Sequence, residues 1–561
     1  AYSVDVWTPG GADLAKGALV EVFRGAFLLG SVAIDQSGSA GWRSIQLNNV
    51  ARFEQDPAAP LTVVITNQNT QISTDPNKKV MADAVRFSRV ADHRITSTPV
   101  FATIPVNVGG TVANRDVVIA ATETGRIYAL NAQGDVTNGS TNVLWSYPSE
   151  RLEGSDPNLV AGEDGPNGIA TMPTGFGISS ALIERVEVSP GNFQWLLYIA
   201  SKNGRVYCLE TEGRGDGTVR RRWTWPDDYP SPVNNLDLGE ITGSITFGLS
   251  ASGANPAAPT IFVPTRTGRL YALDAVGVAG NKSTTVRWQF PDPAGAPLGP
   301  INMTPALAFD RLYFGAGPRF YAVNVNDPEG DQIGNEVWSS TGTGAPNPFV
   351  SFGTSSPVAV SAANIGGGMP DTVFTANNNG AVYALNATDG STIWATAEVG
   401  AGPSGSIGFT YMNTLRNDGS RDHLPVDTAN PGRPVVVVPY ASGRITGFLA
   451  RLGDVNRDST GPVEQGRRAV WGFATLGNSG GFTFNSPAFG GFDSVNAPPA
   501  APLDDDYSWI YVTDSRGYLY GFNDDPDLPD NSQTLTPGDP PLQEDVEVVP
   551  CLLYTSDAAD E

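Results

Sequence analysis

The chain has 561 residues, of which 40% are apolar and 16% are charged, and its formal net charge is −24. That length can hold two or three domains, and that composition is typical of packed globular protein and argues against a disordered chain. The negative charge argues against a nucleic-acid partner, because binding to a phosphate backbone needs clustered Lys and Arg. No apolar run approaches the roughly 20 residues of a membrane-spanning helix, so no membrane span is expected.

Residues 1–91 are predicted to form a β-sandwich, because short stretches alternate apolar and polar side chains between Gly- and Pro-containing turns. The stretches are 2–7, 18–23, 27–34, 41–47, 61–65 and 81–87. The Val-Trp-Thr-Pro segment at 6–9 and the closing Ala-Asp-Ala-Val-Arg-Phe at 82–87 resemble the golvesin/Xly carbohydrate-binding-like domain. The resemblance covers about the last two-thirds of that domain, so the sandwich is expected to be truncated at its N-terminus.

The golvesin resemblance implies attachment to glycan or to the cell envelope. Trp7 and Trp42 are the candidates for stacking on a sugar. A tryptophan on a sandwich strand is more often part of the core, and that alternative is favoured for both.

Residues 95–525 repeat one phrase seven times: an apolar strand, a polar turn, a strand of the type Gly-Arg-aliphatic-Tyr-Ala-Leu, and a fourth strand. The copies centre on Tyr128, Tyr207, Tyr271, Tyr321, Tyr383, Gly447 and Tyr520. The fourth strands carry Trp145, Trp223, Trp288, Trp338, Trp394 and Trp471. Four strands per repeat predict an all-β propeller of seven four-stranded blades, with eight as the alternative. The tyrosines and tryptophans are expected to fill the seams between blades, because large aromatic side chains bury much apolar area.

Several details of the repeat carry their own predictions. Most copies begin with a small polar residue before Pro or Ala, and two of the turns read Asn203-Gly and Asn379-Gly, which predicts hairpins with positive φ at both residues. Thr446-Gly447-Phe448 replaces the tyrosine in the sixth copy, and the seventh copy has no tryptophan. The closing strand of the propeller is expected either from Val85–Val90 or, equally, from an eighth blade lost with the truncated end.

The cleanest copy, Gly380 to Trp394, resembles the pyrroloquinoline-quinone-type propeller repeat. Quinoprotein alcohol dehydrogenases and a lipoprotein of outer-membrane assembly share this repeat. In the dehydrogenases the quinone lies over a tryptophan floor, with calcium, a catalytic Asp and commonly a vicinal disulfide. Cys208 and Cys551 are not adjacent, and Cys208 is predicted to be a buried, inert thiol. Pyrroloquinoline quinone is therefore not expected, and no catalytic or cofactor-binding residue is nominated.

The sequence offers one candidate metal site, a calcium loop formed by Asp454, Asn456, Asp458 and Thr460. Oxygen-bearing side chains at alternate positions are typical of the opening of a calcium loop. Ser459 stands where such loops have a turn glycine, and Gln465 stands where a bidentate acid belongs. The alternative, an Asp- and Asn-rich turn, is favoured.

The C-terminal residues are predicted to lie outside the propeller. Residues 526–550 are acidic and Pro-rich, as linkers are. Residues 551–561 look like the translation of a sequencing adapter, and Ala1 begins inside an apparent strand, so the chain is expected to be a fragment.

Taken together, these patterns predict a non-catalytic binding or scaffold protein that is extracellular, cell-surface or periplasmic. The propeller would bind a protein partner, and the sandwich would bind cell-envelope polysaccharide. The alternative is a quinone-dependent alcohol or sugar dehydrogenase.

Overall fold

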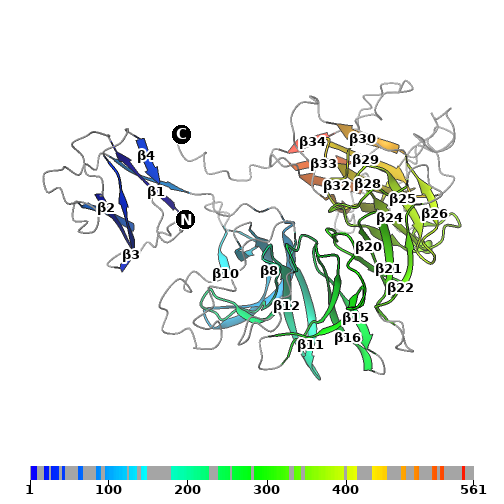
Figure 1. The fold of residues 1–561 in the computed structure, drawn as a ribbon, viewed down its shortest axis with the longest axis horizontal. Coiled ribbons are helices and arrows are strands. Elements are labelled where there is room, and N and C mark those ends of the chain that lie inside the picture. Colours follow the sequence, from blue (N-terminus) through cyan, green and yellow to red (C-terminus); the bar gives the residue numbers. More distant parts are fainter. Residues whose placement is uncertain are drawn as a thin grey trace, which may run out of the picture. The chain divides into compact units, whose positions relative to one another are not determined.

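The computed structural model describes residues 2–8, 18–24, 27–36, 41–44, 61–66, 84–89, 95, 97–122, 125–134, 141–147, 179–226, 238–252, 255–278, 283–326, 334–342, 348–396, 401–412, 433–451, 469–474, 486–491, 508–513, 519–523 and 546–549. The chain forms two compact units, Ala1–Arg94 and Ile95–Leu552. Their regular structure is almost entirely β-strand, as Figure 1 shows.

In its described residues, the first unit contains two three-stranded antiparallel sheets. One places β1 (Tyr2–Thr8) between β4 (Gly41–Ser44) and β6 (Ala84–Arg89), and the other places β2 (Ala18–Arg24) between β3 (Phe27–Ile34) and β5 (Leu61–Thr66). Val20 and Val22 are fully buried whereas Glu21 between them is not, because successive side chains of a strand point to opposite faces. The alternation in the sequence thus predicted these strands correctly.

The second unit contains seven four-stranded antiparallel sheets in its described residues, here called sheets 1 to 7 in chain order. Sheets 1 to 3 consist of β7 (Val100–Val108), β8 (Thr111–Ala121), β9 (Ile127–Asn131) and β10 (Val143–Tyr147); β11 (Leu182–Ser189), β12 (Asn192–Ala200), β13 (Val206–Glu210) and β14 (Arg220–Trp225); and β15 (Thr246–Ser252), β16 (Asn255–Pro264), β17 (Leu270–Asp274) and β18 (Val286–Phe290).

Sheets 4 and 5 consist of β19 (Ala306–Ala308), β20 (Arg311–Ala316), β21 (Arg319–Asn324) and β22 (Glu336–Ser340); and β23 (Val358–Val360), β24 (Thr372–Ala376), β25 (Val382–Asn386) and β26 (Thr392–Ala395). Sheets 6 and 7 consist of β27 (Gly408–Met412), β28 (Arg433–Tyr440), β29 (Arg444–Leu449) and β30 (Ala469–Ala474); and β31 (Ala488–Gly491), β32 (Ser508–Thr513), β33 (Leu519–Asn523) and β34 (Val546–Val549). One short helix, α1 (Ala362–Ile365), lies between β23 and β24.

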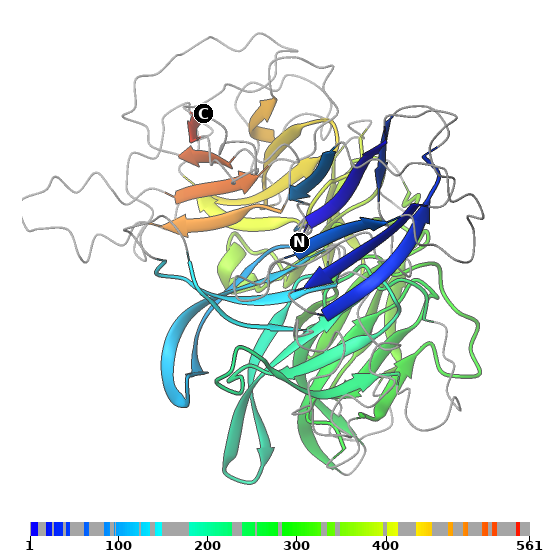
Figure 2. The same cartoon turned by 90° about the vertical axis from the view of Figure 1, so that its left-hand side faces the viewer.

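Each of the seven sheets is a meander in which strands that follow one another in the chain pair. The first strands of successive sheets lie beside one another, from β7 through β11, β15 and β19 to β23. They are therefore the inner strands, and the fourth strands are the outer ones. The hairpins that begin sheets 1 and 2 are longer than the third strands and extend beyond their sheets (Figure 2). The predicted fold class, an all-β propeller of four-stranded blades, is confirmed.

The hydrophobic core lies in the seams between adjacent sheets. One cluster joins Tyr147 of sheet 1 to Leu197 of sheet 2, and another joins Trp394 of sheet 5 to Val436 of sheet 6. The repeat tyrosines lie on third strands and the repeat tryptophans on fourth strands, as predicted. A single sheet cannot bury both of its faces alone, so each one depends on its neighbours.

The structure differs from two expectations about the ends of the propeller. Val85–Val90 does not close the propeller, because β6 pairs with β1 in the first unit. The fourth strand of sheet 7 is instead β34, which lies within the predicted 526–550 linker and pairs with β33. A short Val-Glu-Val-Val stretch pairs as an edge strand despite its acidic, Pro-rich surroundings, because alternation alone suits it to a sheet.

The turns at Asn203-Gly and Asn379-Gly connect second to third strands as expected, but their predicted backbone is wrong. Only the glycines have positive φ, 75° at Gly204 and 87° at Gly380. Both turns have the three-residue form in which a left-handed glycine ends the turn. Asn203 contributes through its side chain, which accepts from Arg205 N and donates to the Tyr207 hydroxyl.

Candidate functional site

The tryptophans of the fourth strands form a repeated contact between sheets. In four of these tryptophans the indole N–H donates to the carbonyl of the residue that follows the third strand of the next sheet. The bonds run from Trp145 to Thr211 (2.8 Å), from Trp223 to Ala275 (3.1 Å), from Trp338 to Ala387 (3.0 Å) and from Trp394 to Ala450 (2.9 Å). This contact, here called the indole latch, satisfies a buried donor and a buried acceptor at the same time.

A glycine of the next sheet lies against most of these indoles. Gly277 has φ 82°, and a β-carbon there would lie 2.3 Å from Cδ1 of Trp223. Gly390 has φ 73°, and a β-carbon there would lie 2.4 Å from Cε3 of Trp338. Only glycine combines this backbone with such a close approach. Gly277 and Gly390, which follow Tyr-Ala-Leu strands, therefore belong to the latch.

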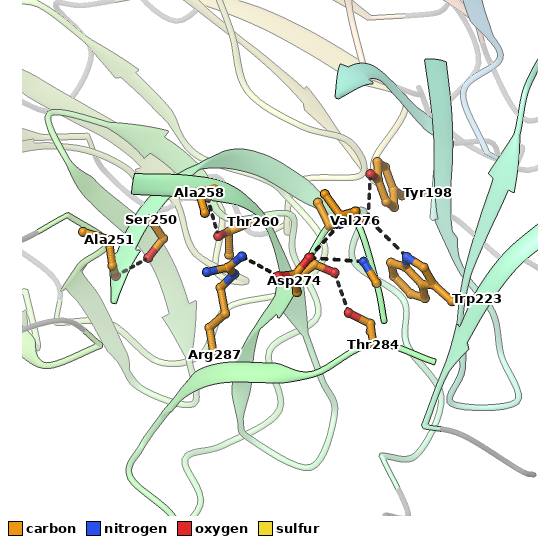
Figure 3. A network of polar contacts seen from close by, with 12 residues as sticks. Tyr198, Trp223, Ser250, Ala251, Ala258, Thr260, Asp274, Val276, Thr284 and Arg287 are labelled. Atoms are coloured by element: carbon orange, nitrogen blue, oxygen red, sulfur yellow. Dashed lines mark hydrogen bonds and ion pairs between the residues drawn. The ribbon is translucent and has the colours of Figure 1, made fainter. Parts of the chain in front are cut away.

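Figure 3 shows the latch between sheets 2 and 3, where several polar groups meet. The Ala275 carbonyl accepts from Trp223 Nε1 and, at 3.0 Å, from the hydroxyl of Tyr198. Arg222 Nε donates to the Val276 carbonyl at 2.7 Å, and Arg222 also pairs with Glu210. Three side chains of sheet 2 thus hold two successive carbonyls of sheet 3.

Asp274 shapes the turn that presents those carbonyls. One oxygen of its carboxylate accepts from the backbone N–H of Val276 at 2.8 Å and of Gly277 at 3.1 Å, and the other pairs with Arg287 (Figure 3). Thr284 donates to the Asp274 carbonyl. The carboxylate is therefore engaged as a turn former, a common use of Asp after a strand.

The latch between sheets 3 and 4 is indirect. Trp288 Nε1 donates to the hydroxyl of Ser250 in its own sheet at 3.0 Å, and Ser250 donates to the Val325 carbonyl of sheet 4 at 2.7 Å. A serine thus relays the contact that an indole makes directly elsewhere.

A second repeated contact runs between the inner strands. A hydroxyl residue stands two positions before every first strand: Thr98, Ser180, Ser244, Thr304, Ser356, Ser406 and Ser486. The backbone N–H of one such residue donates to the hydroxyl of the next, from Thr98 through Ser180, Ser244 and Thr304 to Ser356, and from Ser406 to Ser486, at 2.8–3.1 Å. This hydroxyl belt gives the small polar residues at the repeat starts a physical role that the sequence did not disclose.

The buried titratable groups in the seams are held in their neutral forms. Burial raises the pKa of the Tyr198 hydroxyl and of the Cys208 thiol well above their ordinary values, and it raises the pKa of Tyr313 to about 12. Cys208 is fully buried, as predicted. Desolvation makes these groups poor nucleophiles near neutral pH.

The calcium loop predicted from the sequence stays a prediction. Asp454, Asn456, Asp458 and Thr460 lie outside the described residues. Within the described residues, no three His, Cys, Asp or Glu side chains lie close enough to hold a metal ion. Trp7 and Trp42 are opposite one another in the pairing of β1 with β4.

Comparison with known proteins identifies the repeat. Residues 202–407 match the protein family described as outer membrane protein assembly factor BamB. The propeller is of the PQQ-like type. No curated protein matches the chain.

Solved structures similar to this chain include BamB and Sqt1 proteins from three organisms. BamB from Moraxella catarrhalis is 12% identical with a TM-score of 0.38, over 79% of this chain and 89% of that one. Sqt1 from Saccharomyces cerevisiae is 11% identical with a TM-score of 0.41, over 78% and 84%. Sqt1 from Chaetomium thermophilum is 11% identical with a TM-score of 0.42, over 72% and 80%.

Three of the described tryptophans do not fit the floor of a quinone site. Such a site needs an indole face exposed at the centre of the propeller, beneath the cofactor. The described indoles of Trp145, Trp223 and Trp394 are 1% exposed and lie on outer strands, with their N–H groups bonded to the next sheet. These residues serve the seams and offer no surface to a bound quinone.

No helix within the described part of the chain is long and apolar enough to cross a membrane.

Proposed function

We propose that this PQQ-like propeller is a non-catalytic scaffold of the cell envelope that presents a protein-interaction surface. The observation that carries the proposal is the engagement of the recurring polar groups in contacts between sheets. The indoles, the Asp274 carboxylate and the hydroxyl belt bond mainly to the backbone of adjacent sheets or turns. The residues that differ between repeats lie in the loops and on the surfaces, where scaffold proteins bind their partners.

The family match supports the envelope part of the proposal. The matched family is described as an outer membrane protein assembly factor. A chain with that repeat and a net charge of −24 fits a secreted, cell-surface or periplasmic location. For the first unit we propose attachment to cell-envelope polysaccharide, with β1 and β4 carrying the two candidate tryptophans, Trp7 and Trp42.

A direct test measures binding and turnover with the same full chain. The chain is immobilised and exposed to a purified outer-membrane β-barrel protein diluted from urea, and separately to purified cell-wall polysaccharide. In parallel, the chain is supplied with pyrroloquinoline quinone, Ca²⁺ and a panel of alcohols and sugars, and reduction of a dye is followed.

Saturable binding of the β-barrel protein without dye reduction is the expected result. Dye reduction that depends on both the quinone and an alcohol or sugar would instead establish the dehydrogenase. For the first unit, a Trp7→Ala and Trp42→Ala double variant is expected to lose polysaccharide binding and to keep binding of the β-barrel protein. Polysaccharide binding that survives the double variant would reject the tryptophans as the glycan contacts.

A further inference from the structure

Sheet 7 attaches its fourth strand differently from the other six sheets. In sheets 1 to 6 the fourth strand carries a tryptophan that pairs with the residue after the tyrosine position, as Trp394 pairs with Ala384. In β34 the same register position is Glu547, opposite Gly521. Residues 524–561 contain no tryptophan, so this part of the chain has no indole with which to form a latch.

The fourth strands of sheets 1 to 6 also share a β-bulge that β34 lacks. In each of the six, the pairing with the third strand shifts in register beside the tryptophan, as it does between Thr392 and Trp394. A bulge fixes the register of a strand, because its extra residue fits at one position only. All four residues of β34, Val546–Val549, pair with β33 in regular register. The tryptophan and the bulge that hold the other fourth strands are therefore both missing from β34.

The composition of β34 indicates that it is held less firmly. Trp145, Trp223 and Trp394 are 1% exposed, and a buried indole stabilises its strand through its large apolar area. The side chains of β34 are three valines and one glutamate, and each has a smaller apolar area than an indole. We therefore expect β34 to detach by local opening more readily than the other fourth strands.

The charge of β34 adds to this difference. Glu544, Asp545 and Glu547 lie in the strand or directly before it, and the whole chain has a formal net charge of −24. An acidic strand is repelled by the other charges of an acidic protein, whereas a basic strand is attracted. The β34 strand of a second copy carries the same acidic residues, so it has no advantage over the resident strand.

We propose that β34 is a displaceable strand and that the edge of β33 takes up a basic β-strand of a partner protein in its place. When β34 detaches, the backbone groups of Leu519–Asn523 that pair with it lose their partners. Unpaired strand edges bind extended segments by β-strand addition, in which hydrogen bonds between main chains supply the affinity. The inference rests on the proposed scaffold function and names the kind of segment that the scaffold binds.

Hydrogen exchange of the full chain tests whether β34 detaches. The backbone amides of β34 are compared with those of β26, which also has four residues but carries Trp394. The β34 amides are expected to exchange at least about tenfold faster. Equal protection of the two strands would overturn the proposal, because β34 would then be held as firmly as a strand with a latch.

Peptide binding tests what the edge of β33 accepts. Two fluorescein-labelled peptides are titrated with the full chain and followed by fluorescence anisotropy. One has the sequence of residues 543–550, and the other has lysine in place of Glu544, Asp545 and Glu547. The lysine peptide is expected to bind at least about tenfold more tightly at low salt, with a smaller ratio at high salt. Equal affinities at low salt would overturn the preference for a basic strand.

A pair of proline variants distinguishes the edge of β33 from other acidic surfaces. Val548→Pro with Val549→Pro is expected to remove β34 from the edge, because proline cannot donate to a strand ladder. The lysine peptide should bind this variant at least about tenfold more tightly than the unaltered chain, because the tethered strand no longer competes. Ser532→Pro with Gln533→Pro, which also leaves the charge unchanged but lies outside β34, should not alter the affinity.

Unchanged affinity in the Val548 and Val549 variant would show that the peptide binds elsewhere through charge alone, and the strand-addition site would be rejected. If the β-barrel protein still binds the full chain in that case, the scaffold function stands and only the displaceable strand is lost.

Discussion

The seams on the two sides of sheet 4 use the same tryptophan motif in different ways. Between sheets 4 and 5, the Ala387 carbonyl accepts from Trp338 Nε1, from the Tyr313 hydroxyl at 3.2 Å and from Arg311 at 2.8 Å. Between sheets 3 and 4, the Val325 carbonyl is reached from Trp288 only through Ser250. One carbonyl thus has three donors, and the other depends on a single relay.

The difference originates in the first strand and not in the repeated motif. Ser250 stands six residues after the belt hydroxyl of sheet 3, where sheets 1 and 2 have the buried Ile104 and Val186. A serine there places a hydroxyl between the indole and the carbonyl. The energetic value of one repeated tryptophan therefore depends on its neighbours, as buried hydrogen-bond networks generally do.

The largest expected effect comes from removing an indole. Trp338→Ala should lower the free energy of unfolding by about 4 kcal/mol, because it leaves a large cavity in a buried seam. Trp288→Ala should cost less, because Trp288 is only partly buried and its serine can still bond to Val325. Urea unfolding followed by far-UV circular dichroism measures both values, and equal losses would contradict the distinction between the seams.

Replacing the glycine that packs against an indole should lower the free energy of unfolding by about 2 kcal/mol. In Gly390→Ala the new methyl group would lie 2.4 Å from Cε3 of Trp338, on a backbone with φ 73°. Gly368→Ala is the matched control, because its φ is also 73° but nothing lies within 4 Å of the added carbon. The difference in unfolding free energy between the two variants isolates the contact with the indole, and no difference would remove Gly390 from the latch.

Removing the Ser250 hydroxyl, which links Trp288 to Val325, should lower the free energy of unfolding by about 1–2 kcal/mol. Ser250→Ala leaves both the Trp288 N–H and the Val325 carbonyl without this partner. Ser391→Ala, which removes an exposed hydroxyl bonded to Asp389, should change stability by a few tenths of a kcal/mol at most. A double-mutant cycle with Trp288→Phe should show coupling at Ser250, and additive losses would argue against the relay.

The smallest expected effect is that of Tyr313 on stability, and it appears only at alkaline pH. The pKa of Tyr313 is raised by burial to about 12, whereas in the unfolded chain a tyrosine ionises near pH 10. The unfolded state therefore loses its proton first, so the stability due to this group is complete below pH 10 and falls between about pH 10 and 12. Tyr313→Phe should flatten the decrease in urea midpoint over that range, and an unchanged slope would contradict the burial of the phenol.

Most of the propeller could be predicted from recurring residues. The tyrosine, the following small residue and the tryptophan mark the third and fourth strands, because their spacing reflects one packing arrangement made repeatedly. Thr446 occupies the tyrosine position of sheet 6, opposite Val438, so even the irregular copy keeps its register. The partners of these residues were not predictable, because every latch joins residues far apart in sequence.

The strand pairings and the turn that the sequence did not predict share a physical cause. Val85–Val90 and Val546–Val549 are both short alternating stretches, and local alternation does not say which sheet edge a strand will join. The two-residue turn at Phe309 and Asp310 has positive φ at both residues, although neither is the glycine or asparagine that usually signals it. Packing of the flanking strands overrode the local preference.

The sequence by itself determined the architecture of this protein: four strands per repeat and aromatic residues in the seams. These follow from local periodicity and from the area that aromatic side chains must bury. Only the tertiary structure decided which carbonyl each indole meets and that Ser250 relays one contact. Those outcomes depend on which sheets become neighbours, and a hydrogen bond between distant residues exists only after both have been placed.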